Sequence, residues 1–329
     1  MIPDILLRLA INRLILRADE KQILEEIVDS EAFFRALNPQ LLSRIVGRQV
    51  APMRSGPDDL LRWAERDLRF LRSRGCQVLC MHDRRYPAAL REIFDPPYLL
   101  YVRGALPNDD PSWVAIVGTR DPSAGAVIAA RDLGRDLAGA GLAVVSGLAR
   151  GIDAAAHAGA LEAGYTAAVL ASGVDVVTPS AHRQLAAAIL DRGGCLMSEY
   201  APGLVPMKYH FPARNRIISG LARGVVVVEA PARSGALITA DYALDQGRDL
   251  FVHRDGLWAP RGAGTAELAA DGALIVSTGG DVLREWGISP PPPGAGGNEP
   301  VISQPGTVDD AARARVESVR RALADGVAP

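Results

Sequence analysis

Short runs of apolar residues alternate with longer stretches of helical hydrophobic spacing through the middle of the chain. The predicted strands are Trp113–Val117, Leu142–Val145, Thr166–Leu170, Gly194–Met197, Val225–Val228 and Asp249–Val252. The predicted helices are Ser123–Ala140, Asp153–Ala163, Ala181–Leu190 and Ala236–Asp245. Strands that are apolar along their whole length are buried on both faces. The pattern therefore predicts an α/β fold with a doubly wound, mainly parallel sheet that helices cover on both sides.

The two ends of the chain follow different patterns. Residues 1–75 interleave apolar residues and arginines at helical spacing, which predicts a small N-terminal helical module. The arginines interrupt the apolar runs too often for a signal peptide or a membrane span. Residues 288–307 are rich in proline and glycine and predict a linker. Residues 308–329 hold one predicted helix, Val308–Ala324, and are too short for a complete winged helix.

Three loops that follow predicted strands combine glycine with arginine. They are Gly118–Arg120, Ser146–Gly151 and Ala230–Gly235. In a doubly wound sheet the ligand binds outside the carboxyl ends of the strands. Glycine lets backbone N–H groups approach an anion, and the arginine fork donates paired hydrogen bonds to phosphate oxygens. None of the loops is a Walker A motif or a dinucleotide fingerprint, but three at one edge favour phosphate recognition over a purely structural role.

A basic window lies between residues 203 and 223. It holds four Lys or Arg residues and no Asp or Glu, although the whole chain has a formal net charge of -2. Cations interleaved with Tyr209 and Phe211 fit single-stranded nucleic acid, where cations follow phosphates and aromatic faces stack on bases. The alternative is a solvated helix face whose arginines keep the protein soluble. The window alone leaves both interpretations open.

Composition limits the other possibilities. A chain of 329 residues with 48% apolar content can bury a large core. Its pI near 6.2 argues against indiscriminate coating of nucleic acid, so DNA binding is expected at a confined site. The three cysteines form no metal-ligand pattern and their odd number argues against a disulfide framework. We therefore expect a cytoplasmic protein with no metal, no cofactor and no membrane association.

Several motifs of this chain occur in the order and spacing of one known family. They are Tyr86-Pro87, Pro97–Gly104, Gly118–Arg120, Ser146–Asp153 with His157, Phe211–Ile218, Val227–Ala230 and Ser234–Ala240. The chain resembles the DNA-processing protein A family, DprA or Smf, over about residues 80–280. The resemblance implies an extended Rossmann-like DNA-binding domain at residues 80–287 that binds single-stranded DNA and forms a homodimer. It also implies protection of incoming DNA and loading of RecA recombinase in natural transformation and recombination.

The same resemblance implies a set of nucleic-acid-binding residues. They are Gly118, Arg120, Ser146, Gly147, Arg150, Lys208, Phe211, Arg214, Asn215, Arg216, Ser234 and Gly235. Phe211 is the expected stacking aromatic, with a role as a core anchor as the alternative. For Asn215 the alternative is a backbone-bonding role in a turn. The chain departs from the family at His253–Gly256, where Pro-Gly is usual, and at Ala266, where the family has Asn.

Two other classes of function remain as alternatives. Related Rossmann-like folds include nucleotide phosphoribohydrolases, and the Gly262–Leu268 loop is faintly similar to theirs. Asp153 and His157 are four residues apart on one helical face, a spacing that suits an acid/base or metal pair. Neither an activated nucleophile nor a third ligand accompanies them, so we expect no catalytic residues and a protein that is not an enzyme. The third class is a protein-interaction scaffold with weak DNA binding.

Overall fold

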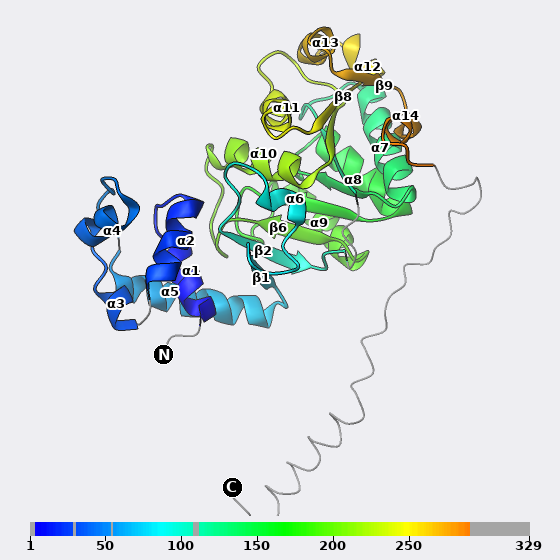
Figure 1. The fold of residues 1–329 in the computed structure, drawn as a ribbon. Coiled ribbons are helices and arrows are strands. Elements are labelled where there is room, and N and C mark those ends of the chain that lie inside the picture. Colours follow the sequence, from blue (N-terminus) through cyan, green and yellow to red (C-terminus); the bar gives the residue numbers. More distant parts are fainter. Residues whose placement is uncertain (1–3, 29–30, 54, 108–111, 290–329) are drawn as a thin grey trace, which may run out of the picture. The chain divides into compact units, whose positions relative to one another are not determined.

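The computed structural model of the protein describes residues 4–28, 31–53, 55–107 and 112–289 (Figure 1). The N-terminal region contains the helices α1 (Asp4–Asn12), α2 (Ala18–Ile27), α3 (Glu31–Arg35), α4 (Pro39–Val46) and α5 (Pro57–Ser73). The strands are β1 (Gln77–Cys80), β2 (Leu99–Gly104), β3 (Trp113–Val117), β4 (Ala143–Ser146), β5 (Thr166–Val169), β6 (Cys195–Ser198), β7 (Gly224–Val227), β8 (Asp249–His253) and β9 (Leu274–Val276). The later helices are α6 (Ala88–Arg91), α7 (Ala124–Gly139), α8 (Ile152–Ala163), η1 (Ser180–His182), α9 (Arg183–Asp191), α10 (His210–Leu221), α11 (Gly235–Asp245), α12 (Arg254–Leu257), α13 (Ala263–Ala270) and α14 (Gly279–Glu285).

Within the described residues, the strands form one sheet in the order β1-β2-β6-β5-β4-β3-β7-β8-β9. All strands from β3 to β9 pair in parallel, whereas β2 joins β6 and β1 joins β2 in antiparallel fashion. The doubly wound, mainly parallel Rossmann-like sheet predicted from the sequence is confirmed. Strand β3 lies between β4 and β7. The direction in which successive strands are added reverses there, so the ligand crevice is expected where β3 and β7 end.

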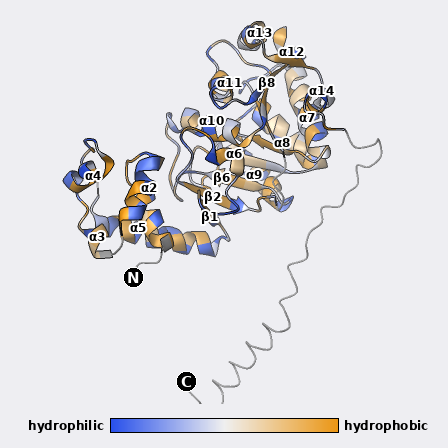
Figure 2. Cartoon of the chain, in the orientation of Figure 1, coloured by the Kyte–Doolittle hydropathy of each residue, from blue (hydrophilic) through white to orange (hydrophobic). Residues whose placement is uncertain are grey.

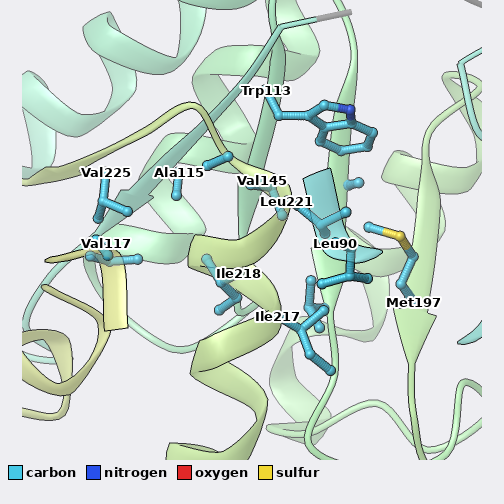
Figure 3. Packing of buried hydrophobic residues seen from close by; sticks show 14 of the residues in the cluster. Leu90, Trp113, Ala115, Val117, Val145, Met197, Ile217, Ile218, Leu221 and Val225 are labelled. Atoms are coloured by element: carbon cyan, nitrogen blue, oxygen red, sulfur yellow. The ribbon is translucent and has the colours of Figure 1, made fainter. Parts of the chain in front are cut away.

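Alternate residues of the strands support two helical layers. Val114 and Ile116 of β3 belong to the buried cluster that includes α7 and α8, and Ala115 and Val117 belong to the cluster that includes α10 and α11. This is the two-residue period expected of a strand. Figure 3 shows the α10 side of the core, where Ile217, Ile218 and Leu221 share one buried cluster with Ala115, Val145 and Met197 of the strands. The sheet therefore fixes the position of α10 firmly.

Helix α10 was not among the helices predicted by their bounds. The sequence left the basic window open between a nucleic-acid contact and a solvated helix face, and its second half is helical from His210 to Leu221. Pro212 is the third residue of the helix, and a proline in the first turn breaks no intrahelical hydrogen bond. Strands β1 and β2 were also not predicted as strands, and β2 lies in the motif Pro97–Gly104 of the family resemblance.

The N-terminal helices carry apolar and polar residues on opposite sides, visible as orange and blue on the same helices in Figure 2. Leu9, Leu24 and Phe34 share a buried cluster with Leu99 and Tyr101 of β2. The predicted linker and the predicted helix Val308–Ala324 lie outside the described residues, apart from the first two positions of the linker. In the part of the chain that the structure describes, no helix combines the length and apolar character that crossing a membrane requires.

Candidate functional site

A cleft of about 380 Å³ lies at the carboxyl edge of the sheet, where β3 and β7 end. The loop after β3, the first turn of α11 and the exposed side of α10 form its walls. Seven of the residues predicted from the family resemblance line it: Gly118, Arg120, Phe211, Arg214, Asn215, Ser234 and Gly235. The cleft therefore occupies the ligand position that the topology of the sheet predicts.

Arg120 and Phe211 form the most distinctive contact of the cleft. Arg120 is exposed, and its guanidinium carbon lies 5.3 Å from the centroid of the Phe211 ring. Phe211 is the second residue of α10 and is only half-buried. A guanidinium at this distance from an aromatic face is in cation–π range. The cleft thus offers a fixed cation and a partly exposed aromatic ring side by side.

The loop after β4 is closed by its own side chains. The carboxylate of Asp153, in the first turn of α8, accepts hydrogen bonds from the N–H groups of Gly147 at 3.1 Å and Ala149 at 3.2 Å. The buried hydroxyl of Ser146 donates to the carbonyl oxygen of Ile116 at 2.6 Å. The expectation that Ser146 and the Gly147 amide contact a phosphate does not fit this geometry, because both are used internally. Arg150 of the same loop is exposed.

Arg214 is a brace beneath that loop. Its side chain is 3% exposed, and its guanidinium donates to the carbonyl oxygens of Gly147 and Val169. Burial lowers the pKa of Arg214 to about 10, and the nearby Asp153 carboxylate offsets part of that effect. The group therefore stays charged at neutral pH. Arg214 was predicted as a DNA contact, and the structure instead places it at the cleft floor with its donors directed into the protein.

Arg216 lies outside the cleft. Two residues along a helix are separated by about 200° of rotation, so Arg214 and Arg216 point in opposite directions. Arg216 forms ion pairs with Glu199 at 2.7 Å and Asp95 at 3.0 Å, and its side chain is 11% exposed. It lines a separate cavity of about 930 Å³ beside Lys21. Both arginines were predicted as DNA contacts, and α10 instead directs them to opposite sides.

Asn215 links two walls of the cleft. Its side-chain amide donates to the carbonyl oxygen of Gly235 at 3.1 Å, and its carbonyl oxygen accepts from Arg214 Nε at 3.2 Å. Ser234 caps α11, because its hydroxyl oxygen accepts from the N–H of Ala236 at 3.2 Å. Asn215 therefore sits in a helix rather than in the turn considered from the sequence, and it holds the first turn of α11 against α10.

Lys208 precedes α10 and is exposed. Among the described residues, none forms an ion pair with it. It does not line the cleft, but it lies only three residues before Phe211, which does. Lys208 and Arg150 therefore offer exposed positive charge in segments that adjoin the cleft walls, whereas Arg214 and Arg216 have their charge committed to internal partners.

The loop after β3 depends on Glu229, a residue of the Val227–Ala230 motif for which no role was predicted from the sequence. Glu229 is 1% exposed, and its carboxylate accepts from the N–H of Ser123 at 2.9 Å and from its hydroxyl at 2.7 Å. The backbone carbonyl of Glu229 accepts from the N–H of Thr119 at 2.7 Å. This acidic residue fixes the path of the loop that carries Arg120. An acidic residue directly after an apolar strand was the available signal for this role.

Asp153 and His157 do not form an acid/base pair. His157 is fully buried, and its Nδ1 lies 2.7 Å from the Thr166 hydroxyl oxygen. The Thr166 hydroxyl donates to the Val144 carbonyl at 2.9 Å, so His157 Nδ1 carries the hydrogen that it shares with Thr166. Burial lowers the pKa of His157 to about 3, which keeps the imidazole neutral. Asp153 faces the loop instead, and within the described residues no three His, Cys, Asp or Glu side chains gather into a metal site.

The positions that depart from the family pattern have partners of their own. His253 precedes α12 and its Nδ1 accepts from the N–H of Asp255 at 3.2 Å. Beside Ala266, the hydroxyl oxygen of Thr265 accepts from the N–H of Ala230 at 2.8 Å. Thr265 therefore connects α13 to the loop after β7. At the next position the family has an asparagine, whose amide hydrogen bonds Ala266 cannot make.

Fold and cleft together define a Rossmann-like α/β protein with an open, cation-bearing crevice at the reversal point of its sheet. Residues 77–287 match the family described as DNA recombination-mediator protein A, and the chain belongs to that family. The DNA processing protein DprA of Streptococcus pneumoniae is 43% identical over 205 residues, which cover 62% of this chain and 72% of the relative. The DNA processing protein DprA of Bacillus subtilis is 38% identical over 216 residues, which cover 65% of this chain and 72% of the relative.

Solved structures agree with this assignment. The X-ray structure of DNA processing protein A from Streptococcus pneumoniae matches with a TM-score of 0.68 and 36% identity, covering 86% of this chain and 98% of that chain. A structure of DNA processing protein A from Helicobacter pylori matches with a TM-score of 0.57 and 29% identity, covering 64% of this chain and 95% of that chain. The latter is described as giving structural insights into a unique single-stranded DNA binding mode of that protein.

Proposed function

We propose that this protein binds single-stranded DNA in the cleft where β3 and β7 end. The observation that carries the proposal is the contact of Arg120 with the Phe211 ring. Single-strand binding combines cations that follow the phosphates with aromatic faces on which bases stack. Arg120 supplies the first and Phe211 the second. Neither element reads a base edge, so binding is expected to show little sequence preference.

The proposed contact residues are six that line the cleft and two exposed cations beside it. They are Gly118, Arg120, Phe211, Asn215, Ser234 and Gly235, with Arg150 and Lys208 at its approaches. Arg214, Ser146 and Gly147 act in support, by fixing the floor of the cleft. We assign no catalytic residue, because Asp153 accepts hydrogen bonds from the loop after β4 and His157 is hydrogen-bonded to Thr166 in the core.

The finer roles rest on the family. The relatives are DNA processing proteins, and the Helicobacter pylori protein is described with a single-stranded DNA binding mode. We propose by this likeness that the protein acts in the cytoplasm as a homodimer, protects incoming DNA and loads RecA recombinase in natural transformation and recombination. Stimulation of RecA filament formation on protected single strands, measured with the purified chain, tests the last step.

Fluorescence anisotropy of labelled oligo-dT against salt concentration tests the binding itself. Three exposed cations, Arg120, Arg150 and Lys208, give an expected log–log slope of about −2 at about −0.7 per phosphate contact. Arg120→Ala should weaken binding and flatten the slope by about 0.7. The matched control is Arg69→Ala, an exposed arginine of α5. A salt-insensitive affinity, or equal affinity for blunt duplex, would contradict the proposal.

A further inference from the structure

Trp258 stands apart from the other tryptophans of the chain. Its side chain is 86% exposed, whereas Trp113 and Trp286 are 5% and 7% exposed and Trp63 is half-buried. One exposed apolar side chain is ordinary on a protein surface. Its place in the fold must therefore decide whether Trp258 has a function.

The turn that carries Trp258 is held rigidly. His253 is buried and lies with Nε2 3.0 Å from the carbonyl oxygen of Ser277, while its Nδ1 caps α12. Gly256 packs so closely that a Cβ there would lie 1.9 Å from the carbonyl oxygen of Val228. The N–H of Gly262 closes the following turn on Ala259 at 2.9 Å. A fixed backbone thus presents the indole to solvent, so little conformational freedom is lost when it stacks on a ligand.

Trp258 belongs to the same edge of the sheet as the cleft. Strands β3, β7 and β8 are parallel neighbours, so their carboxyl ends and the loops that follow lie side by side. Arg261, three residues after Trp258, donates to the backbone carbonyl of Asp121 and pairs with its carboxylate. Asp121 adjoins Arg120, which contacts Phe211. A continuous series of contacts therefore joins the turn of Trp258 to the aromatic ring of the cleft.

The charges around Trp258 decide what kind of contact it makes. Arg261 compensates Asp121, and the exposed Arg254 is followed by the exposed Asp255. These two positive and two negative charges cancel, so together they do not repel a phosphate backbone. Its main binding contribution would come from stacking of the indole on a base, which every base allows.

We propose that Trp258 is a second stacking platform for the single strand that occupies the Phe211 cleft. The strand runs from α10 across the loops after β3 and β7 to the turn after α12. The proposal rests on the proposed DNA-binding function and extends its footprint. It also gives a role to the segment from His253 to Gly256, where the chain departs from its family.

A strand too short to reach both aromatics gains nothing from the second. Trp258→Ala in the full chain should therefore weaken binding of an oligo-dT of roughly 16 nucleotides by ~5- to 150-fold, the range that loss of one stacked base gives, and spare one of roughly 4 nucleotides. The salt slope should stay unchanged because no charge is removed. Trp258→Phe should retain affinity, since it keeps an aromatic face. Oligo-dT should quench the tryptophan fluorescence of the unmodified protein by stacking on Trp258, and this quenching should be lost in Trp258→Phe.

The control is Phe94→Ala, which removes an aromatic side chain that is fully exposed and lies outside the cleft. It should leave both affinities unchanged. Trp258→Ala with unchanged affinity for the long strand, or with equal losses for both strands, overturns the platform and leaves the proposed function standing. The platform is also overturned if Trp258→Ala keeps its affinity but changes the mass of the protein in light scattering. That result would place Trp258 in a contact between protein chains. Unmodified protein that binds neither strand would instead remove the proposed function.

Discussion

The guanidinium of Arg214 donates a hydrogen bond to the carbonyl oxygen of Gly147 across 2.8 Å, from α10 to the loop after β4. A Cβ at position 147 would lie 2.5 Å from the same guanidinium. Two residues that both resemble DNA contacts in the sequence therefore hold each other in place. Their shared task is to shape the floor of the cleft.

Arg214→Ala should lower the free energy of unfolding by about 3–5 kcal/mol, because it leaves the buried Asp153 carboxylate without its counter-charge. Arg214→Lys should recover little of this, since an ammonium cannot reproduce the planar fork that donates to two carbonyl oxygens. Urea denaturation of both variants measures the loss. Arg69→Ala is the control for removing an exposed arginine, and a loss no larger than that of the control would contradict the brace.

Gly147→Ala should also destabilise the protein, by about 1–3 kcal/mol of overpacking against the Arg214 guanidinium. In the Arg214→Ala background the same change should cost less, because the group that it would clash with is gone. A double-mutant cycle by urea denaturation should therefore show a coupling of about 0.5–3 kcal/mol. Strict additivity would mean that the two residues do not limit each other.

Phe211→Ala should weaken oligo-dT binding by roughly 1–3 kcal/mol through lost stacking, with an unchanged salt slope. The ring is half-buried and belongs to none of the buried clusters of the described residues, so the melting temperature should change little. Phe211→Tyr keeps an aromatic face and should bind nearly normally. A lower melting temperature with normal affinity would favour the core-anchor interpretation of Phe211.

Arg216→Ala should behave in the opposite way to Arg120→Ala. It removes the partner of Glu199 and Asp95, so the free energy of unfolding should fall. The salt slope of DNA binding should remain that of the unmodified protein, because the Arg216 charge does not face the cleft. Anisotropy titrations at several salt concentrations separate the two arginines. A flattened slope for Arg216→Ala would place its charge on the DNA path.

His157 should make the protein sensitive to acid. Its pKa is about 3 in the folded protein, below the value of about 6.5 for an unfolded chain. Its contribution to stability is therefore complete above pH 6.5 and falls by about 1.4 kcal/mol per pH unit as pH drops toward 3. His157→Gln should flatten the dependence of the unfolding free energy on pH between about 4.5 and 6.5. A pH dependence as steep in His157→Gln as in the unmodified protein would contradict this role of His157.

The central sheet could be predicted because its parallel strands coincide with short apolar runs of the sequence. Trp113–Val117 was predicted with the bounds that the structure shows, and the other parallel strands β4 to β8 were found within one residue at each end. Burial on both faces leaves no room for polar positions, so the signal is strong. The three-residue β9 is too short to give this signal, and the antiparallel β1 and β2 precede the alternation of strands and helices, so these three strands were not predicted.

The sequence predicted where the site lies, but not which of its residues face a ligand and which support the cleft. Glycine and arginine at three strand ends marked the correct edge of the sheet. The sequence does not show that Asp153 takes the loop amides, nor that Arg216 has two carboxylate partners, since Glu199 and Asp95 are remote in the chain. Recognising α10 would have helped. Ile217, Ile218 and Leu221 have the spacing of the buried face of a helix. Once this helix is assigned, its period shows that Arg214 and Arg216 point in different directions.

The internal use of the Gly147 and Ala149 amides by Asp153 has a consequence for selectivity. Many related folds enclose one phosphate in a cradle of backbone donors and so hold a mononucleotide. Here the Asp153 carboxylate already occupies two of these backbone donors. A ligand must therefore bind through contacts that are spread along the cleft. Each contact is weak alone, and only a ligand that spans several can sum them. The cleft should therefore distinguish a polymer from its monomers, and free nucleotides should compete poorly with even a modest length of strand.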